Sequence, residues 1–392
     1  MALRCGWRHL ALVLVLFLII QFVFYFKPEA IESVRNVPAK FNYGGLNKKP
    51  TPAVAEDTGD VAADPHHPSR FVAKTTRENA AFVILCRNTD LDSIKESLTE
   101  LEEKFNNRYH YPYVFLNEKP FTDEFKNSIS EVVSGTTHFG IIPTEHWSYP
   151  PWIDQDRARQ EREKMAKNHV IYGGSEPYRH MCRFNSGFFF RHPLLAQYDW
   201  YWRVEPSVKF PCIIDKDPFK VLRENNKLYG FTISIKEYPK TIPTLWNTTL
   251  KFMDEFPNHV SNPNMLKFIQ KAGTNGTPEY NGCHYWSNFE VGSLNFFRSD
   301  EYLAYFDYLD RAGGFFYERW GDAPVHSIAL SIFLDKSKIH WFEDLGYFHG
   351  PLWNCPKGEA HKRLQCTCEE KKSIETENPN WSCIKEFIRT PN

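Results

Sequence analysis

The sequence predicts one α/β domain built on a parallel sheet, and three observations near the start of that domain lead to this fold class. Residues 80–86 (AAFVILC) form a continuous apolar run, which is typical of a strand buried on both faces. Apolar residues then recur every three or four positions from Leu91 to Phe105, as on one face of a helix, with Asp90 placed to cap it. Residues 111–118 (YPYVFLNE) form a second strand, so the order strand–helix–strand predicts parallel pairing.

Later segments continue this alternation, which favours a single domain. Proline cannot donate to a strand ladder, so Pro206 ends one strand. Ser299 and Gly313 are typical of the two ends of a helix. The chain contains no glycine-rich dinucleotide or P-loop motif, and both classes of nucleotide site lose their main support. We expect helices at 123–133, 154–170, 299–314 and 321–334, and strands at 138–143, 198–208 and 229–235.

The N-terminal residues predict a membrane anchor. Residues 10–26 form an apolar run that only Gln21 interrupts, which suffices for a short transmembrane helix. Arg4 and Arg8 precede the run and no small-residue cleavage site follows it, so we expect a signal anchor and a type II, single-pass protein. A span this short favours the Golgi apparatus, or the endoplasmic reticulum, over the plasma membrane. The expected parts are a cytosolic tail (1–9), the anchor (10–26), a stem (27–77) and a lumenal domain (78–392).

Composition narrows the partners and the compartment. A formal net charge of -1 leaves no basic surplus, so nucleic acid is not expected as a partner. Aromatic residues make up 16%, which suits carbohydrate recognition and equally suits a large aromatic core. All of the 9 cysteines except Cys5 follow the predicted anchor, and this even number allows disulfides in an oxidising lumen. The two cysteines of residues 366–368 (CTC) suggest a zinc site. No second pair of cysteines or histidines lies at the required spacing, which disfavours this interpretation.

Two acidic positions compete as the site of a metal-bound diphosphate. Glu205 ends the predicted strand 198–208, and ligands of open α/β sheets bind outside the carboxyl ends of strands. A divalent cation held there would neutralise a diphosphate. Asp215 and Asp217 form a literal D-x-D pair, although Asp217 before Pro218 is also typical of a helix cap. Spacing alone leaves the two positions equal, and a surface turn is the simpler interpretation of Glu205.

Histidine and arginine add further candidates. His349 follows a predicted strand, and Mn²⁺ accepts carboxylates and tolerates one imidazole. A histidine among aromatic residues at a strand end is nevertheless more often structural. Arg183 lies near Tyr178 and suits bidentate binding of phosphate, with an ion pair to nearby acids as an equal alternative. Other histidines that qualify as ligands or bases are His284, His326 and His340.

Glu290 stands out because it is the single carboxylate in residues 280–292 (YNGCHYWSNFEVG), a segment of aromatic and amide side chains. A solvated acid usually lies among lysine, serine and glycine, and a core strand usually excludes acids. Glu290 fits neither pattern.

Five long motifs in the same order resemble the fungal α-1,2-mannosyltransferases of glycosyltransferase family 15, over about residues 78–355. These motifs are YRHMCRFNSGFFF, YWRVEPSVKFPC, YNGCHYWSNFEVG, RWGDAPVHSIALSIFL and LGYFHGP. The resemblance implies a GT-A fold, which is a Rossmann-like domain for nucleotide sugars. It also implies GDP-mannose as donor, Mn²⁺ as cofactor, retention of anomeric configuration and mannosylated glycoprotein glycans as acceptors.

The resemblance also implies roles for individual residues, and it favours Glu205 over Asp215 and Asp217. The implied roles are metal binding for Glu205 and His349, donor binding for Tyr178, Arg203, Arg183 and Glu205, a nucleophile or oxocarbenium stabiliser at Glu290, and a place near the donor mannose or acceptor for Asp322. We expect Glu290 to line a sugar-sized pocket, in which nearby polar residues orient either Glu290 or the mannose hydroxyls by hydrogen bonds. Those polar residues are Asn281, His284 and Asn288. Ser207 and Ile213 depart from the family pattern, since each stands where many members have aspartate.

Two alternative functions stay open at this point. The first is transfer of mannose phosphate to the same glycans, an activity also associated with the family, and the mass of the product distinguishes it. The second is a catalytically silent mannan-binding protein of the Golgi. Retention of Glu205, Glu290 and His349 disfavours this second alternative.

Overall fold

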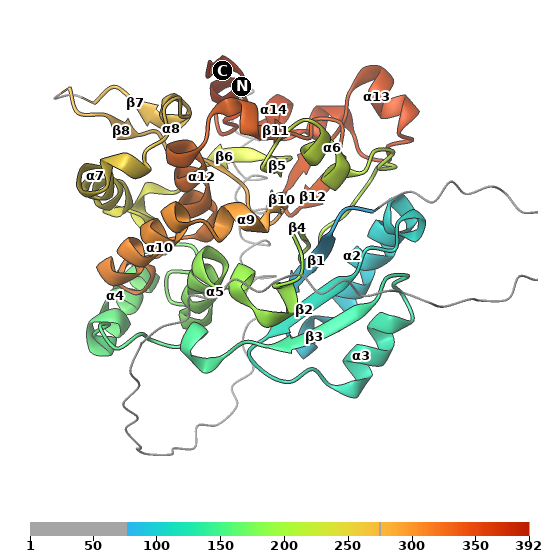
Figure 1. The fold of residues 1–392 in the computed structure, drawn as a ribbon, viewed down its shortest axis with the longest axis horizontal. Helices are drawn as coiled ribbons and strands as arrows, with labels where there is room; N and C mark the ends of the chain where they lie inside the picture. The colour runs from blue at the N-terminus through green and yellow to red at the C-terminus, as the bar shows by residue number, and fades with distance from the viewer. Residues whose placement is uncertain (1–76, 274–275, 392) are drawn as a thin grey trace, which may run out of the picture. The chain divides into compact units, whose positions relative to one another are not determined.

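A seven-stranded mixed sheet forms the centre of the computed structural model, which describes residues 77–273 and 276–391 (Figure 1). The strand order is β11-β5-β10-β4-β1-β2-β3, and three two-stranded sheets pair β12 with β13, β6 with β9, and β7 with β8. The strands are β1 (Ala80–Leu85), β2 (Tyr113–Asn117), β3 (Thr137–Ile141), β4 (Trp200–Arg203), β5 (Tyr229–Phe231), β6 (Ser234–Lys236), β7 (Gln270–Lys271), β8 (Glu279–Tyr280), β9 (Cys283–Tyr285), β10 (Glu290–Ser293), β11 (Ile339–Trp341), β12 (Tyr347–His349) and β13 (Leu352–Asn354).

Helices cover both faces of this sheet, with α2 and α3 on one side of β1–β3 and α5, α10 and α12 on the other (Figure 1). The α-helices are α2 (Leu91–Lys104), α3 (Asp123–Ser130), α4 (Gln155–Lys167), α5 (Glu176–Gly187), α6 (Pro218–Glu224), α7 (Leu245–Glu255), α8 (Leu266–Ile269), α9 (Leu294–Phe297), α10 (Asp300–Ala312), α11 (Gly314–Tyr317), α12 (Asp322–Phe333), α13 (Gly358–Arg363), α14 (Ile374–Glu377) and α15 (Ile384–Arg389).

Strand β1 shows why the apolar run 80–86 is continuous. Phe82 and Ile84 pack in the cluster that includes the apolar side chains of α2 and α3. Ala81 and Val83 pack in the cluster on the opposite face, with residues of α5, α10 and α12. Both faces of the strand are therefore buried, and its parallel pairing with β2 and β4 agrees with the predicted strand–helix–strand unit.

The sheet is not purely parallel, and in this respect the sequence prediction is wrong. β10 lies between β4 and β5 and runs antiparallel to both. The predicted strand 229–235 is also two strands, because β5 stays in the main sheet while β6 pairs with β9.

The helix-end predictions have mixed outcomes. Ser299 caps α10 by accepting a hydrogen bond from the Tyr302 amide, and Gly313 ends that helix with a left-handed φ of 78°. Asp90 does not cap α2. Its carboxylate instead accepts the Arg87 amide at 2.8 Å, and so stabilises the turn before the helix.

Three disulfides join the C-terminal segment to itself and to the body of the domain. Cys355 pairs with Cys368, whereas Cys212–Cys366 and Cys283–Cys383 span 154 and 100 residues. Each long bridge connects a strand or turn of the central domain to the tail. The predicted cysteine-rich tail is thus anchored onto the domain.

The predicted cytosolic tail, anchor and most of the stem (residues 1–76) lie outside the described residues. Within the described ranges, none of the helices has the length and apolar character that crossing a membrane requires.

Candidate active site

Arg203 is the centre of a cluster of three carboxylates at the carboxyl end of β4. Its Nη1 lies 2.5 Å from Asp322 Oδ2 and 4.0 Å from Glu290 Oε1, and its Nη2 contacts Glu205 Oε1. The fold brings these groups together from three elements. Arg203 ends β4, Glu290 begins β10 directly opposite it in the antiparallel register, and Asp322 begins α12. Glu205 follows two residues after the strand.

The cluster carries an excess of negative charge. Burial raises the pKa of Asp322, but Arg203, His326 and Ser287 together more than offset burial and hold the pKa below its usual range. Burial likewise raises the pKa of Glu205, and Arg203 and His349 together lower it to about 2. Both carboxylates are therefore ionised at neutral pH. One guanidinium cannot neutralise both Glu205 and Asp322, so the site suits an additional cation.

Glu205 and His349 form a pair that fits a divalent metal ion. His349 ends β12, and its Nε2 lies 3.4 Å from Glu205 Oε2, close enough for both atoms to bind one cation. Both side chains are partly exposed, at 29% and 24%, so a ligand from solvent can reach them. The Nδ1 atom of His349 is buried without a hydrogen-bond partner. An ionised carboxylate with one imidazole is a donor set that suits Mn²⁺.

Cysteine clusters in the described residues do not offer a competing metal site. Each group of three metal-ligating side chains there includes cysteines that are joined in disulfides. A disulfide sulfur is not a thiolate and does not bind zinc in the usual way. Cys366 and Cys368 are both joined in disulfides, which leaves no thiolate for zinc at residues 366–368.

Glu290 is 1% exposed and is held by groups that the sequence did not indicate as its partners. Tyr229 donates its hydroxyl to Glu290 Oε2 at 2.9 Å, and His326 Nδ1 lies 3.0 Å from the same oxygen. Glu290 Oε1 has no hydrogen-bond partner. It borders a cavity of ≈10 Å³, room for about one water molecule. This cavity is smaller than the sugar-sized pocket expected, because Phe189 and Tyr201 close around the carboxylate.

The polar residues expected to orient Glu290 serve other contacts. Asn281 bonds the backbone at Phe268 and Cys283, His284 faces the Gly282 carbonyl, and Asn288 accepts the Tyr347 hydroxyl. These contacts do not orient Glu290, because neighbours in sequence need not face one another in the fold. The expected role of these residues toward the mannose hydroxyls stays a prediction. A signal for His326 was nevertheless present. It lies four residues after Asp322, and such residues share one face of a helix.

Arg183 lies in a separate buried ion pair. Its Nε and Nη2 donate to the two carboxylate oxygens of Asp310 at 2.7 and 2.8 Å, and its guanidinium covers the Phe188 ring at 4.7 Å. This is the ion-pair alternative that the sequence left open. A guanidinium engaged in this way has little capacity left for a phosphate, so the donor-binding role expected for Arg183 finds no support in its contacts.

Tyr178 lies on the same helix as Arg183, in a different environment. Its ring stacks on Tyr172 with a centroid separation of 4.5 Å, and Arg319 covers the ring at 5.2 Å. Arg319 in turn pairs with Glu237 at 3.5 Å. The contacts of Tyr178 place it beside a second buried charged group, and its role toward the donor stays a prediction.

The literal D-x-D pair is structural. Asp217 accepts the Phe219 amide at 3.0 Å as the cap of α6, and the Tyr111 hydroxyl donates to its other oxygen at 2.7 Å. Asp215 forms an exposed ion pair with Arg363. The choice of Glu205 over this pair agrees with these contacts.

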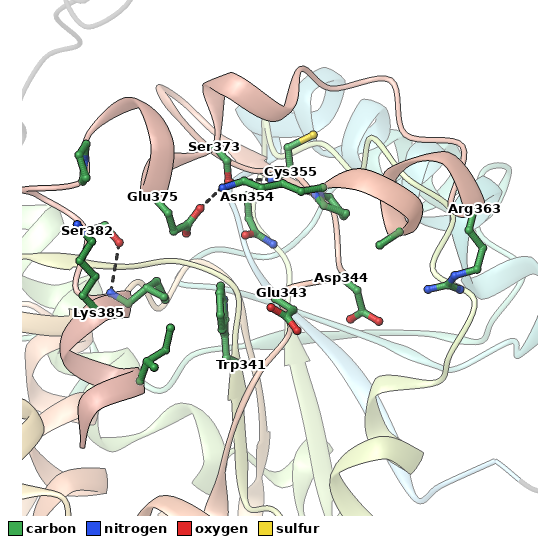
Figure 2. Close-up of a pocket in the computed structure, with 16 residues that line it drawn as sticks. Trp341, Glu343, Asp344, Asn354, Cys355, Arg363, Ser373, Glu375, Ser382 and Lys385 are labelled. Atoms are coloured by element: carbon green, nitrogen blue, oxygen red, sulfur yellow. Dashed lines mark hydrogen bonds between the residues drawn. The ribbon is translucent and has the colours of Figure 1, made fainter. Parts of the chain in front are cut away.

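A larger cavity lies under the C-terminal segment, beyond the carboxyl end of β11 (Figure 2). It measures ≈590 Å³, and Trp341, Glu343, Glu375 and Arg363 are among the residues that line it. Neither Glu205 nor Glu290 belongs to its lining.

Comparison with known proteins decides the family. The family model of the glycolipid 2-alpha-mannosyltransferases, glycosyltransferase family 15, matches residues 46–392. The chain belongs to this family. Among its relatives, the "Alpha-1,2 mannosyltransferase KTR1" of Saccharomyces cerevisiae is 54% identical, over 79% of this chain and 78% of that protein. The "Glycolipid 2-alpha-mannosyltransferase 1" of Candida albicans is 49% identical, over 89% of this chain and 81% of that protein.

Solved structures of the family share the fold. The Mn/GDP form of core-mannan synthase A from Aspergillus fumigatus has a TM-score of 0.75 at 40% identity, over 81% of this chain and 86% of that one. The mannosyltransferase Ktr4p of Saccharomyces cerevisiae in complex with GDP has a TM-score of 0.76 at 41% identity, over 80% of this chain and 82% of that one. The fold is therefore GT-A-like, as the resemblance implied.

Proposed function

We propose that the protein is a retaining α-1,2-mannosyltransferase that transfers mannose from GDP-mannose to mannose residues of N-linked or O-linked glycans on glycoproteins. The observation that carries the proposal is the Arg203 cluster, which combines a metal-binding pair with a buried carboxylate at the carboxyl edge of the sheet. Relatives named as α-1,2-mannosyltransferases and a neighbouring structure that holds Mn and GDP support it.

The residues of the cluster have complementary roles in this reaction. The C1–phosphate bond of GDP-mannose breaks and its electron pair leaves with GDP. The acceptor hydroxyl oxygen forms the new bond to C1, and its proton passes to a diphosphate oxygen. The positive charge that develops at C1 needs a carboxylate close to it, and Glu290 supplies one. Asp322, fixed by Arg203 and by the Ser287 hydroxyl at 2.7 Å, lies beside Glu290 and suits the hydroxyls of the bound sugars.

Glu205 and His349 would hold Mn²⁺, which supplies Lewis-acid neutralisation of the diphosphate charge. Because the pKa of Glu205 is about 2, the carboxylate needs no deprotonation before it binds a cation. Arg203 keeps Glu205 in place at the end of β4. Its second nitrogen at the same time holds Asp322, so one guanidinium aligns the metal side and the sugar side of the site.

We place the protein in the Golgi membrane as a single-pass type II protein, with the catalytic domain in the lumen. The apolar run 10–26 after basic residues supports this topology. The three disulfides support an oxidising compartment. Microscopy of the tagged full chain, with protease protection of the C-terminal tag in intact membranes, tests the placement. Cleavage of that tag without detergent would contradict it.

Product analysis tests the activity. The full chain in detergent micelles, with GDP-mannose, Mn²⁺ and a panel of α-mannosides, should add one hexose in 1,2-linkage, as read by mass spectrometry and linkage analysis. A product heavier by hexose plus phosphate would instead identify a mannosylphosphate transferase. Absence of product on every acceptor, from a folded protein that binds GDP, would support the silent mannan-binding alternative.

A further inference from the structure

The carboxylate of Glu290 is held through one oxygen only. Oε2 accepts the Tyr229 hydroxyl at 2.9 Å and faces His326 Nδ1 at 3.0 Å. Oε1 accepts no hydrogen bond of normal geometry and lies 4.0 Å from Arg203 Nη1, beside the small cavity. Tyr201 also lines this cavity, and the nearby Glu290 carboxylate adds to the effect of burial in raising the pKa of Tyr201. A buried polar atom without a partner is costly, and such atoms concentrate where function requires them. The asymmetry leaves Oε1 as the oxygen that is free to act.

His326 is placed to act as a cation. It is fully buried, and both ring nitrogens face acceptors, since Nδ1 faces Glu290 Oε2 and Nε2 faces the Asn185 carbonyl at 3.0 Å. A neutral imidazole has one N–H and can satisfy only one of them, whereas an imidazolium satisfies both. Burial lowers the pKa of His326, but the Glu290 carboxylate and then Asp322 together raise it more, and the net pKa lies above its usual value.

Other groups around His326 do not reverse this charge state. Asp322 on the same helix favours the imidazolium, whereas Arg203 on β4 opposes it. Tyr302 of α10 and Phe297 of α9 contribute only ring contacts, at centroid separations of 6.2 and 4.8 Å. The carboxylate in direct contact therefore dominates.

We propose that His326 is the positioning residue for Glu290: its imidazole ring and the Tyr229 hydroxyl fix Oε2 and present Oε1 to the anomeric carbon of the donor. This inference rests on the proposed function. A carboxylate fixed at one oxygen cannot rotate away from the reacting carbon, and loss of such alignment is costly for rate. Asp322 and His326 lie one helical turn apart, so α12 supplies both the sugar-side acid and the support of Glu290.

The test compares His326→Gln with His192→Gln in the full chain. His192 is also buried and bonds the Ile141 carbonyl at 3.2 Å, but it lies near β3, away from the cluster. Glutamine keeps one donor near Glu290 and removes the positive charge. We expect His326→Gln to lower kcat by about 10²-fold, while KM for GDP-mannose changes by less than about twofold. The Kd for GDP with Mn²⁺, measured by calorimetry, should stay unchanged. We expect His192→Gln to retain kcat.

A second variant covers the case in which His326→Gln does not fold. Tyr229→Phe removes the other donor to Oε2 without changing the size of the ring, and we expect kcat to fall by about tenfold at unchanged KM. A kcat for His326→Gln within about threefold of that for His192→Gln would overturn the inference. So would an unchanged kcat in Tyr229→Phe. If the wild-type chain transfers mannose and these variants do as well, only the inference fails. If the wild type binds GDP and transfers no mannose, the proposed function itself fails.

Discussion

Two buried arginines in this domain show opposite balances of charge. Arg183 pairs with the single carboxylate Asp310 through two hydrogen bonds and lies against the Phe188 ring. Arg203 faces Asp322, Glu205 and Glu290 at once. The Arg183–Asp310 pair has no capacity for a further ligand, because its charges balance and both carboxylate oxygens accept a hydrogen bond from the guanidinium. The Arg203 cluster retains negative charge and a carboxylate oxygen without a partner, and so has capacity to bind a cation and a reacting sugar.

This difference teaches that a buried arginine in a promising motif is a poor indicator of function by itself. A better indicator is the negative charge and the number of hydrogen-bond acceptors that remain without a partner around the arginine. Substitutions should separate the two arginines, since changes around Arg203 should affect activity, and changes around Arg183 should affect stability.

Substitution of Glu205 should have the largest effect on activity. Glu205→Gln removes the carboxylate that we propose binds the metal, together with its charge, at the end of β4. We expect kcat to fall by about 10³-fold. Because the pair with Arg203 is partly exposed and Arg203 keeps two other acids, stability should fall by about 1 kcal/mol or less. Transfer assays and urea unfolding measure the two quantities. A large loss of unfolding free energy that accompanies the loss of kcat would show that Glu205 is structural.

Substitution of Asp310 should give the reverse result. Asp310→Asn leaves the Arg183 guanidinium buried without a countercharge, and we expect unfolding free energy to fall by about 3–5 kcal/mol. Activity per folded molecule should stay close to the wild-type value. Chemical denaturation measures the unfolding free energy, and transfer rates normalised to folded protein measure the activity per folded molecule. A large loss of specific activity with intact stability would place Arg183 in the donor site after all.

Substitution of His349 should act on metal affinity. His349→Ala removes one of the two proposed protein ligands, so we expect the Mn²⁺ concentration for half-maximal activity to rise by about 10–100-fold. The rate at saturating Mn²⁺ should recover in large part, because Glu205 and the diphosphate would still be available to bind the ion. A metal titration of activity measures this. An unchanged titration curve would exclude His349 as a ligand.

The smallest expected effect is on the pH dependence of stability, in which His340 and His326 should differ. Burial, and then Lys227 nearby, lower the pKa of His340 to about 4, whereas the pKa of His326 is raised. Because the pKa of His340 is lower in the folded state than in the unfolded state, the unfolded state takes up a proton first as the pH falls. The free energy of unfolding therefore decreases as the pH falls from about 6.5 toward about 4. His340→Gln should therefore flatten the loss of stability across that range. An unchanged slope in thermal melts from pH 7 to 4 would contradict this.

Much of the fold was predictable because its signals are local. The strand β1, the helix α2 and the cap at Ser299 each follow from spacing or residue type within one segment. The antiparallel insertion of β10 was not predictable in this way, since it depends on which strands meet. The site shows the same limit. The resemblance indicated Glu290 and Arg203 separately, but their pairing across two strands, and the support from His326, required the structure.

Substitution of Glu290 tests the central claim most directly. The full-length wild-type chain and its Glu290→Gln variant would be compared in transfer of mannose from GDP-mannose to an α-mannoside, with GDP binding measured on both. We predict a 1,2-linked product from the wild type, a loss of kcat of about 10³-fold or more in the variant, and unchanged GDP affinity. A variant that is folded and transfers mannose at the wild-type rate would contradict the assignment of Glu290 and of the cluster around it.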